Sequence, residues 1–157
     1  MRIRRNPIAR PELAASEIFI DEPILNKGHW HELFLKKQPI YLELGCGKGT
    51  FIAKMSSSMP NTNFIAVDIK SEVLFLAKRN VEQTFKELNK NIENVYLTAY
   101  NIELINNIFD ENDKVNRIYI NFCNPWPRPK HKKRRLTHPR QLNHYKKFLI
   151  PSGEIFF

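Results

Sequence analysis

Residues 40–49, with the sequence IYLELGCGKG, decide the fold of this chain. A short, mostly apolar run passes directly into three glycines at alternate positions, which is typical of a buried strand followed by a tight turn. Apolar residues then recur at helical spacing until Pro60-Asn61, a pair that ends helices. The stretch therefore predicts a strand, a glycine loop and a helix over residues 51–59, the first unit of an α/β domain.

Strand-like and helix-like segments alternate along the rest of the chain. Further strands are predicted at residues 64–67, 95–97, 117–122 and 154–157. Further helices are predicted at residues 71–88 with Ser71 as N-cap, at residues 102–109, and from Thr137 to Leu149. This alternation predicts a doubly wound α/β fold, with a mostly parallel sheet and helices on both faces.

Length and composition fit one domain. The chain has 157 residues, of which 42% are hydrophobic, enough for a single sizeable core. We predict that residues 1–38 form a basic N-terminal extension and residues 39–157 the domain. No apolar run approaches the ~20 residues of a membrane span, and none follows the basic start as in a signal peptide. The two cysteines, Cys46 and Cys123, lie far apart in the sequence and do not indicate a disulfide framework. We therefore expect a cytoplasmic protein in which both cysteines are packing residues.

The net charge of +9 is concentrated at the two ends of the sequence. Residues 1–11 hold four arginines and no acidic residue, and residues 128–153 hold nine lysines and arginines and no acidic residue. A charge that served only solubility would be spread evenly. The two basic stretches therefore indicate a polyanionic partner, with solvated basic faces as the alternative.

Ligands of doubly wound sheets bind outside the carboxyl ends of the strands, where Glu43 and Asp68 are expected. Glycines allow a ligand to approach the backbone closely, and an acid at the end of the second strand can accept hydrogen bonds from ribose hydroxyls. Thr50 occupies the sixth position of the glycine pattern, so the dinucleotide fingerprint is absent. The pattern favours S-adenosylmethionine, which has no pyrophosphate, over a nicotinamide dinucleotide. The sequence contains no obvious metal-binding cluster.

The segment after the fourth predicted strand indicates the substrate. It has three prolines within residues 125–129, which exclude a helix there and make a stiff loop. The continuation of this loop, residues 130–135, holds five lysines and arginines, a density suited to gripping phosphates. Trp126 fits either stacking on a nucleobase or anchoring the loop by packing, and His131 fits a phosphate or solvent contact. RNA is therefore the expected substrate.

The chain resembles the bacterial tRNA (guanine-N7-)-methyltransferases along its whole length. The shared motifs are a Met-Arg-x-Arg start, Glu43-x-Gly-x-Gly-x-Gly49-x-Phe51, and above all Asn121-Phe-x-x-Pro-Trp-Pro followed by His131-Lys-Lys-Arg-Arg-Leu-Thr137. The resemblance implies a Rossmann-like class I methyltransferase fold. It also implies transfer of a methyl group from S-adenosylmethionine to N7 of guanine 46 in the variable loop of tRNA.

The resemblance and the motifs together assign the site. The cofactor contacts would be Glu43, Gly45, Gly47, Gly49, Asp68, Asn101 and Asn124. The RNA contacts would be Arg128, Lys132, Lys133, Arg134 and Arg135. Asn124 would also be the catalytic residue, although the family usually has Asp there, and an amide accepts a hydrogen bond without carrying charge. The family also usually has an acid at position 101.

Three points stay open in the sequence. The family continues past the fifth strand into a Thr-Asp motif, a helix and a closing pair of strands, so we expect these elements to be missing from a chain that ends at Phe157. Asn124-Pro-Trp-Pro also resembles the Asn-Pro-Pro-aromatic motif of exocyclic-amine methyltransferases, and a non-catalytic RNA-binding protein on the same fold is a further alternative. With tRNA as partner, both a monomer and a homodimer are compatible with the sequence.

Overall fold

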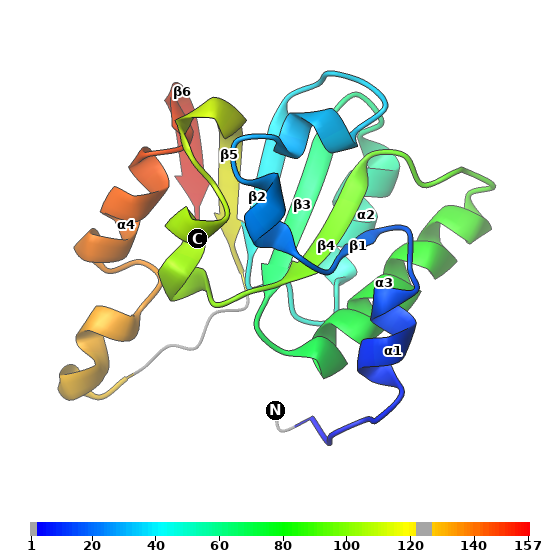
Figure 1. Ribbon diagram of the computed structural model, residues 1–157, viewed down its shortest axis with the longest axis horizontal. Coiled ribbons are helices and arrows are strands. Elements are labelled where there is room, and N and C mark those ends of the chain that lie inside the picture. The colour runs from blue at the N-terminus through cyan, green and yellow to red at the C-terminus, as the bar shows by residue number, and fades with distance from the viewer. Residues whose placement is uncertain (1–2, 122–126) are drawn as a thin grey trace.

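The protein was analysed as a computed structural model, which describes residues 3–121 and 127–157. Six parallel strands form one sheet in the order β1-β4-β3-β2-β5-β6 (Figure 1). The strands are β1 (Phe19–Ile20), β2 (Ile40–Leu44), β3 (Asn63–Asp68), β4 (Val95–Ala99), β5 (Val115–Ile120) and β6 (Leu149–Phe156). The α-helices are α1 (Ala9–Ala14), α2 (Thr50–Ser58), α3 (Ser71–Glu87) and α4 (Pro139–Lys146). The 3-10 helices are η1 (Pro23–Asn26), η2 (Trp30–Leu33), η3 (Ile102–Asn107), η4 (Glu111–Asp113) and η5 (Pro129–Arg134).

The strand order reverses at β2, which lies between β3 and β5. The chain moves from β2 outward through β3 to β4, then crosses back and continues outward on the other side through β5 to β6. This reversal confirms the predicted doubly wound fold. The switch point lies between the carboxyl ends of β2 and β5, and doubly wound sheets bind their ligands at such a point.

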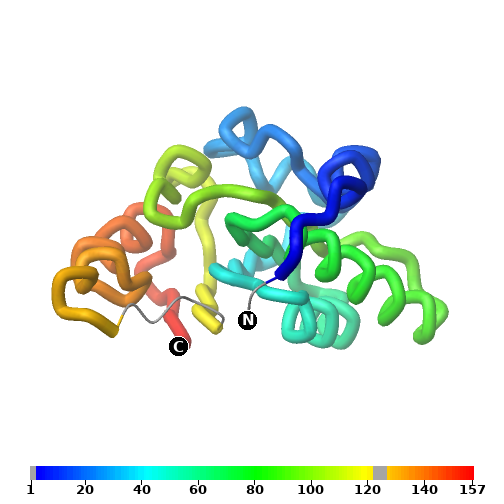
Figure 2. The backbone as a smooth tube through the Cα atoms, turned by 90° about the horizontal axis from the view of Figure 1, so that it is seen from below, coloured from blue at the N-terminus to red at the C-terminus, as the bar shows by residue number. Residues whose placement is uncertain are grey.

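Helical segments lie on both faces of the sheet (Figure 2), and an apolar core packs against each face. One core packs α1, α2 and α3 against the sheet, with Phe64 and Leu74 fully buried in it. The other packs η2, η3 and α4 against the opposite face, around Trp30 and Tyr145. Because both faces are covered, β2 and β3 are apolar along most of their length, as the sequence predicted.

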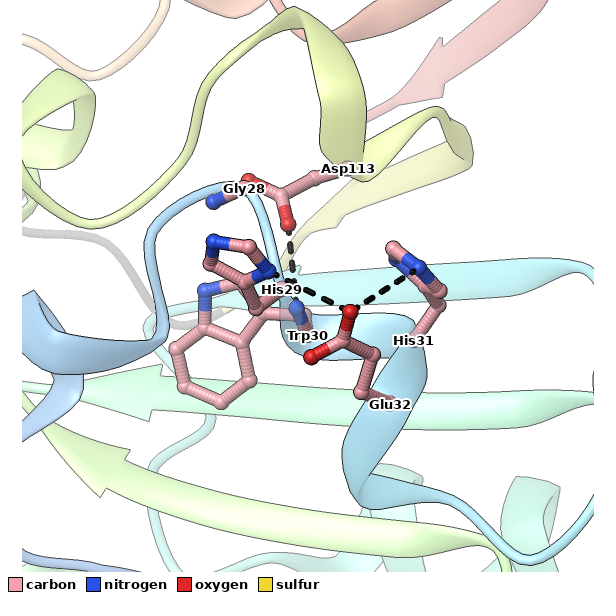
Figure 3. A network of polar contacts seen from close by, with 6 residues as sticks. All are labelled: Gly28, His29, Trp30, His31, Glu32 and Asp113. Carbon is pink, nitrogen blue, oxygen red and sulfur yellow. Dashed lines mark hydrogen bonds and ion pairs between the residues drawn. The ribbon is translucent and has the colours of Figure 1, made fainter.

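The N-terminal segment is packed onto the sheet. Its strand β1 pairs with β4 at one edge, and α1 packs on α3. Asp113 fixes the segment from the other side, because its carboxylate accepts hydrogen bonds from the backbone N–H groups of Gly28 (2.9 Å) and Trp30 (3.2 Å) (Figure 3). The indole of Trp30 also donates to the carbonyl of Ile108 at 2.6 Å. Residues predicted as an extension therefore contribute to the sheet and to both cores.

Three local predictions were wrong. Ser71 is the first residue of α3 and not its cap, because Lys70 takes the extended cap conformation. Leu88, expected on the buried face of that helix, lies just past its end and is 51% exposed. The basic segment predicted as a loop forms η5, a 3-10 helix whose first residue is Pro129, since proline is tolerated at the first position of a helical turn.

The last strand is longer than predicted. Leu149, expected on the inner face of the preceding helix, begins β6, so the strand starts five residues before the predicted position. Pro151 and Gly153 hid the first part of this strand from sequence analysis, because proline and glycine are rare inside strands. They are tolerated because β6 is the edge strand of the described sheet, and its register with β5 shifts beside them. Within the described residues, no helix has both the length and the apolar character needed to cross a bilayer.

Candidate functional site

The glycine loop after β2 folds over the end of β3. Gly45, Gly47 and Gly49 have φ angles of 77°, 55° and 82°, in the left-handed region that glycine adopts at little cost. The N–H groups of Gly45 and Cys46 both donate to the carbonyl of Val67, at 2.8 and 3.3 Å. The loop is thereby fixed by backbone hydrogen bonds next to the position where the strand order reverses.

Gly49 also has a packing role. It lies at the N-cap of α2, and a Cβ atom there would come within 2.6 Å of the Cα atom of Ala77 in α3. Only glycine permits this approach of the two helices. The close packing accounts for the residue by itself, so its predicted contact with a cofactor stays a prediction.

Asp68 at the end of β3 is held by the glycine loop. One carboxylate oxygen accepts a hydrogen bond from the N–H of Gly47 at 3.1 Å, and the other accepts one from the N–H of Lys70 at 3.2 Å. Burial raises the pKa of this carboxyl above its ordinary value, and the backbone donors oppose that rise. Each oxygen has further lone pairs, so Asp68 can orient the loop and accept ligand hydroxyls simultaneously.

Glu43 in β2 is the most deeply buried acid at the carboxyl ends of the strands, with 1% of its surface exposed. Its Oε2 accepts a hydrogen bond from the side-chain amide of Asn121 at 2.8 Å. Its Oε1 is buried and has no hydrogen-bond partner among the described residues. A buried oxygen in that condition costs free energy unless a ligand donates to it, so the geometry itself indicates a donor-bearing ligand.

Burial also changes the charge of Glu43. It raises the pKa of this carboxyl to about 8, with the nearby charge of Asp68 adding to the effect and the Asn121 hydrogen bond opposing it. At neutral pH the ligand-free carboxyl is therefore largely protonated. A cationic group placed at Oε1 would favour the ionised form, so binding of a cation and loss of a proton are coupled at this residue.

Asn101 follows β4 at the same edge of the sheet. Its side-chain oxygen accepts a hydrogen bond from the N–H of Glu103 at 3.0 Å and so caps η3. The neighbouring Tyr100 donates its N–H to the carbonyl of Asp68 at 3.0 Å, which ties this segment to the end of β3. The structure thus brings Glu43, Asp68 and Asn101 to adjacent strand ends, as the sequence predicted for a parallel sheet.

The start of the described chain, residues 3–8, and the basic helix η5 both lie toward the carboxyl ends of the strands, at the lower edge of Figure 1. In and beside η5, Arg128, Lys132, Lys133 and Arg134 are exposed, while Arg135 is half-buried and donates to the carbonyl of Pro127 at 3.4 Å. A charged surface gathered at this edge suits a large anionic ligand that must reach the glycine loop.

The N-terminal arginines differ among themselves. Arg4 and Arg5 are exposed. Arg10 forms an ion pair with Asp21 at 2.6 Å and also lies 3.5 Å from the hydroxyl of Ser71 at the start of α3. Part of the positive charge counted in the sequence is therefore neutralised within the protein.

Asn124, Cys123 and Trp126 lie outside the described residues. Cys46 is fully buried, and burial raises the pKa of its thiol well above the ordinary value, in agreement with a packing role. No cluster of three or more potential metal ligands occurs within residues 3–121 and 127–157. Sequence reasoning gave no role to Asn121 and placed it within the strand predicted at residues 117–122, whereas the structure ends β5 at Ile120 and leaves Asn121 directly after it.

Comparisons with known proteins agree with this geometry. The family model described as "Putative methyltransferase" matches residues 37–157. The tRNA (guanine-N(7)-)-methyltransferase of Clostridium botulinum is 60% identical over 157 residues, which are all of this chain and 72% of that protein.

Solved structures share the fold at lower identity. The arsenic (III) S-adenosylmethionine methyltransferase of Chlamydomonas reinhardtii superposes with a TM-score of 0.59 at 18% identity, over 98% of this chain and 49% of that one. PKMT2 of Rickettsia typhi, solved in complex with AdoHcy, gives a TM-score of 0.52 at 22% identity, over 85% of this chain and 24% of that one.

Proposed function

Because the chain belongs to the tRNA (guanine-N(7)-)-methyltransferase family, we propose that it transfers a methyl group from S-adenosylmethionine to N7 of guanine 46 in tRNA. The proposal rests mainly on one observation: the candidate cofactor site and a basic surface lie on the same side of the sheet, at the carboxyl ends of its strands. The buried Glu43, the half-buried Asp68 and the glycine loop lie there together with exposed basic segments. A cytoplasmic location follows from the substrate as part of the same proposal.

The residues of the edge fit S-adenosylmethionine. The unpartnered Oε1 of Glu43 is an acceptor for the cationic amino group of the methionine part, and Asp68 offers acceptors for the ribose hydroxyls. The positive φ angles of Gly45 and Gly47 keep the loop free of side chains where the ligand would approach. Asn101 would contact the same ligand from the end of β4, and Asn124 from outside the described residues.

The methyl transfer requires no acid or base group from the protein. The cofactor supplies an electrophilic methyl group on a sulfonium. Guanine N7 has an aromatic lone pair and no proton to remove, so no general base is required. The chain's residues would therefore act by holding both reactants in line and by excluding water. Arg128, Lys132, Lys133, Arg134 and Arg135 would bind tRNA phosphates and so determine where the target base arrives.

The direct test is methylation of an unmodified tRNA transcript with labelled S-adenosylmethionine, followed by mapping of the modified nucleotide. We expect label at one guanine of the variable loop, at N7, which is recognised by chain cleavage after reduction. Label on an exocyclic amine of adenine or cytosine would replace the proposal with the alternative methyltransferase class. Tight tRNA binding without any methyl transfer, and without cofactor binding in calorimetry, would indicate a non-catalytic RNA-binding protein.

A further inference from the structure

We propose that Asn121 is a positioning residue, which orients the carboxylate of Glu43 so that Oε1 faces the cofactor. The inference deepens the proposed function and rests on it. It gives a role to a side chain that lies 78 positions from Glu43 in the sequence and donates to it at 2.8 Å.

The hydrogen bond spans the place where the strand order reverses. Glu43 belongs to β2, and Asn121 follows the last residue of the neighbouring strand β5. These two strands are hydrogen-bonded to each other, with Leu44 opposite Ile120. The backbone therefore holds the amide of Asn121 beside the carboxylate, and the contact requires no movement of either strand.

The bond determines which oxygen of Glu43 is available. Oε2 is occupied by the amide of Asn121, whereas Oε1 has no hydrogen-bond partner among the described residues. A carboxylate with two free oxygens rotates about its last torsion, which is broad in energy. With Oε2 fixed, the rotation is restricted and Oε1 is presented in one direction. Preorganisation of this kind strengthens binding by removing the cost of ordering the group.

An amide is the suitable partner because it donates a hydrogen bond without adding charge. Its donor favours the ionised form of Glu43, against the burial that favours the protonated form. The other titratable groups described near Glu43 are Asp68 at the end of β3 and the thiol of Cys46 in the glycine loop. Neither offers a positive charge, so Asn121 is the group that offsets burial.

The experiment compares Asn121→Ala with a matched control, Gln83→Ala. Gln83 donates its amide to Glu87 at 2.9 Å on the exposed surface of α3, so the control removes the same kind of hydrogen bond away from the site. Binding of S-adenosylhomocysteine is measured by calorimetry between pH 6 and 9 for the parent, both variants, Glu43→Gln and the double variant Glu43→Gln/Asn121→Ala. Thermal unfolding of each protein confirms that it is folded.

We expect Asn121→Ala to weaken binding roughly tenfold to a hundredfold, the usual value of a hydrogen bond to a charged group. The midpoint of its pH dependence should move to higher pH, because the ionised form of Glu43 has lost its donor. Gln83→Ala should leave both quantities unchanged. In the Glu43→Gln background, Asn121→Ala should have little further effect, because the two residues act as one unit.

The outcomes separate this inference from the proposed function. A parent protein that binds no S-adenosylhomocysteine would contradict the proposed function itself. A parent that binds, together with an Asn121→Ala variant of unchanged affinity and unchanged pH midpoint, would overturn only the role of Asn121. Weakened binding of equal size with and without Glu43→Gln would likewise overturn it, since Asn121 would then act through some other group.

Discussion

The end of β2 and the basic helix η5 face the same proposed reaction but are built in opposite ways. Glu43 is almost completely buried, and its position is fixed by strand pairing on both sides and by one hydrogen bond. The residues of η5 include no buried side chain. At the first region, electrostatics is strong because water is excluded, and at the second it is screened by solvent and salt.

The difference indicates how each region recognises its ligand. A buried, preorganised acid discriminates by geometry and by protonation state, so single substitutions should have large effects. An exposed basic helix contributes through the sum of several weak contacts, so single substitutions should have small effects and salt should modulate them all. Four variants, taken here from the largest expected effect to the smallest, test this contrast.

Asp68→Ala should produce the largest change. It removes acceptors for two ribose hydroxyls, each worth about 1.5–3 kcal/mol, so affinity for S-adenosylmethionine should fall roughly 100- to 10,000-fold. It also releases the N–H of Gly47, which Asp68 holds at 3.1 Å. Calorimetric titration measures the loss, with tRNA binding as the control that should hardly change. An affinity within threefold of the parent would show that the pocket has been assigned to the wrong edge.

Gly49→Ala should act on stability before it acts on binding. The new Cβ would meet Ala77 at 2.6 Å, and the left-handed φ of 82° is unfavourable for alanine. Strain and overpacking together should lower the free energy of unfolding by about 2–5 kcal/mol. Denaturant unfolding measures this change. A variant with parental stability but weakened cofactor binding would instead assign Gly49 to the ligand.

Glu43→Gln should stabilise the ligand-free protein in a pH-dependent way. The folded-state pKa of about 8 lies above the ordinary 4.5, so the folded protein holds a proton that the unfolded chain releases. The parent should therefore lose stability as the pH rises from about 4.5 to 8, and Gln, which never ionises, should not.

The expected gain of Glu43→Gln is at most about 4 kcal/mol at pH 8, shrinking toward zero near pH 4.5. Melting temperatures of parent and variant across this range give the measurement, and S-adenosylmethionine binding should weaken in the same variant. A stability difference that does not vary with pH would mean that Glu43 has an ordinary pKa in the folded protein.

Replacing Lys132, Lys133, Arg134 and Arg135 together by alanine should weaken tRNA binding about tenfold to a hundredfold at moderate salt. Each lost phosphate contact should also remove about 0.7–0.9 from the slope of log K against log salt concentration. Cofactor affinity should stay at the parental value. Filter binding at several salt concentrations measures the tRNA affinity and the salt slope. An unchanged slope would mean that these residues form only a solvated surface.

Much of the architecture was readable from local patterns. The run from Ile40 to Gly49 predicted the first strand and its glycine loop, and Asp68 was placed at the end of the next strand. These predictions held because buried parallel strands are apolar along their length and left-handed turns require glycine. The same logic failed for β6, where Pro151 and Gly153 lie in an edge strand, and for the cap of α3.

The sequence by itself determined the strand-and-helix alternation, the glycine loop, the acids at the strand ends and the two basic stretches, because each depends on residues close together in the chain. Only the tertiary structure decided that Asn121 donates to Glu43, that Gly49 packs on Ala77, and that Asp113 anchors residues 28–30. Each of these contacts joins distant segments. The register of the sheet and the packing of the helices bring them together, and no local pattern encodes either.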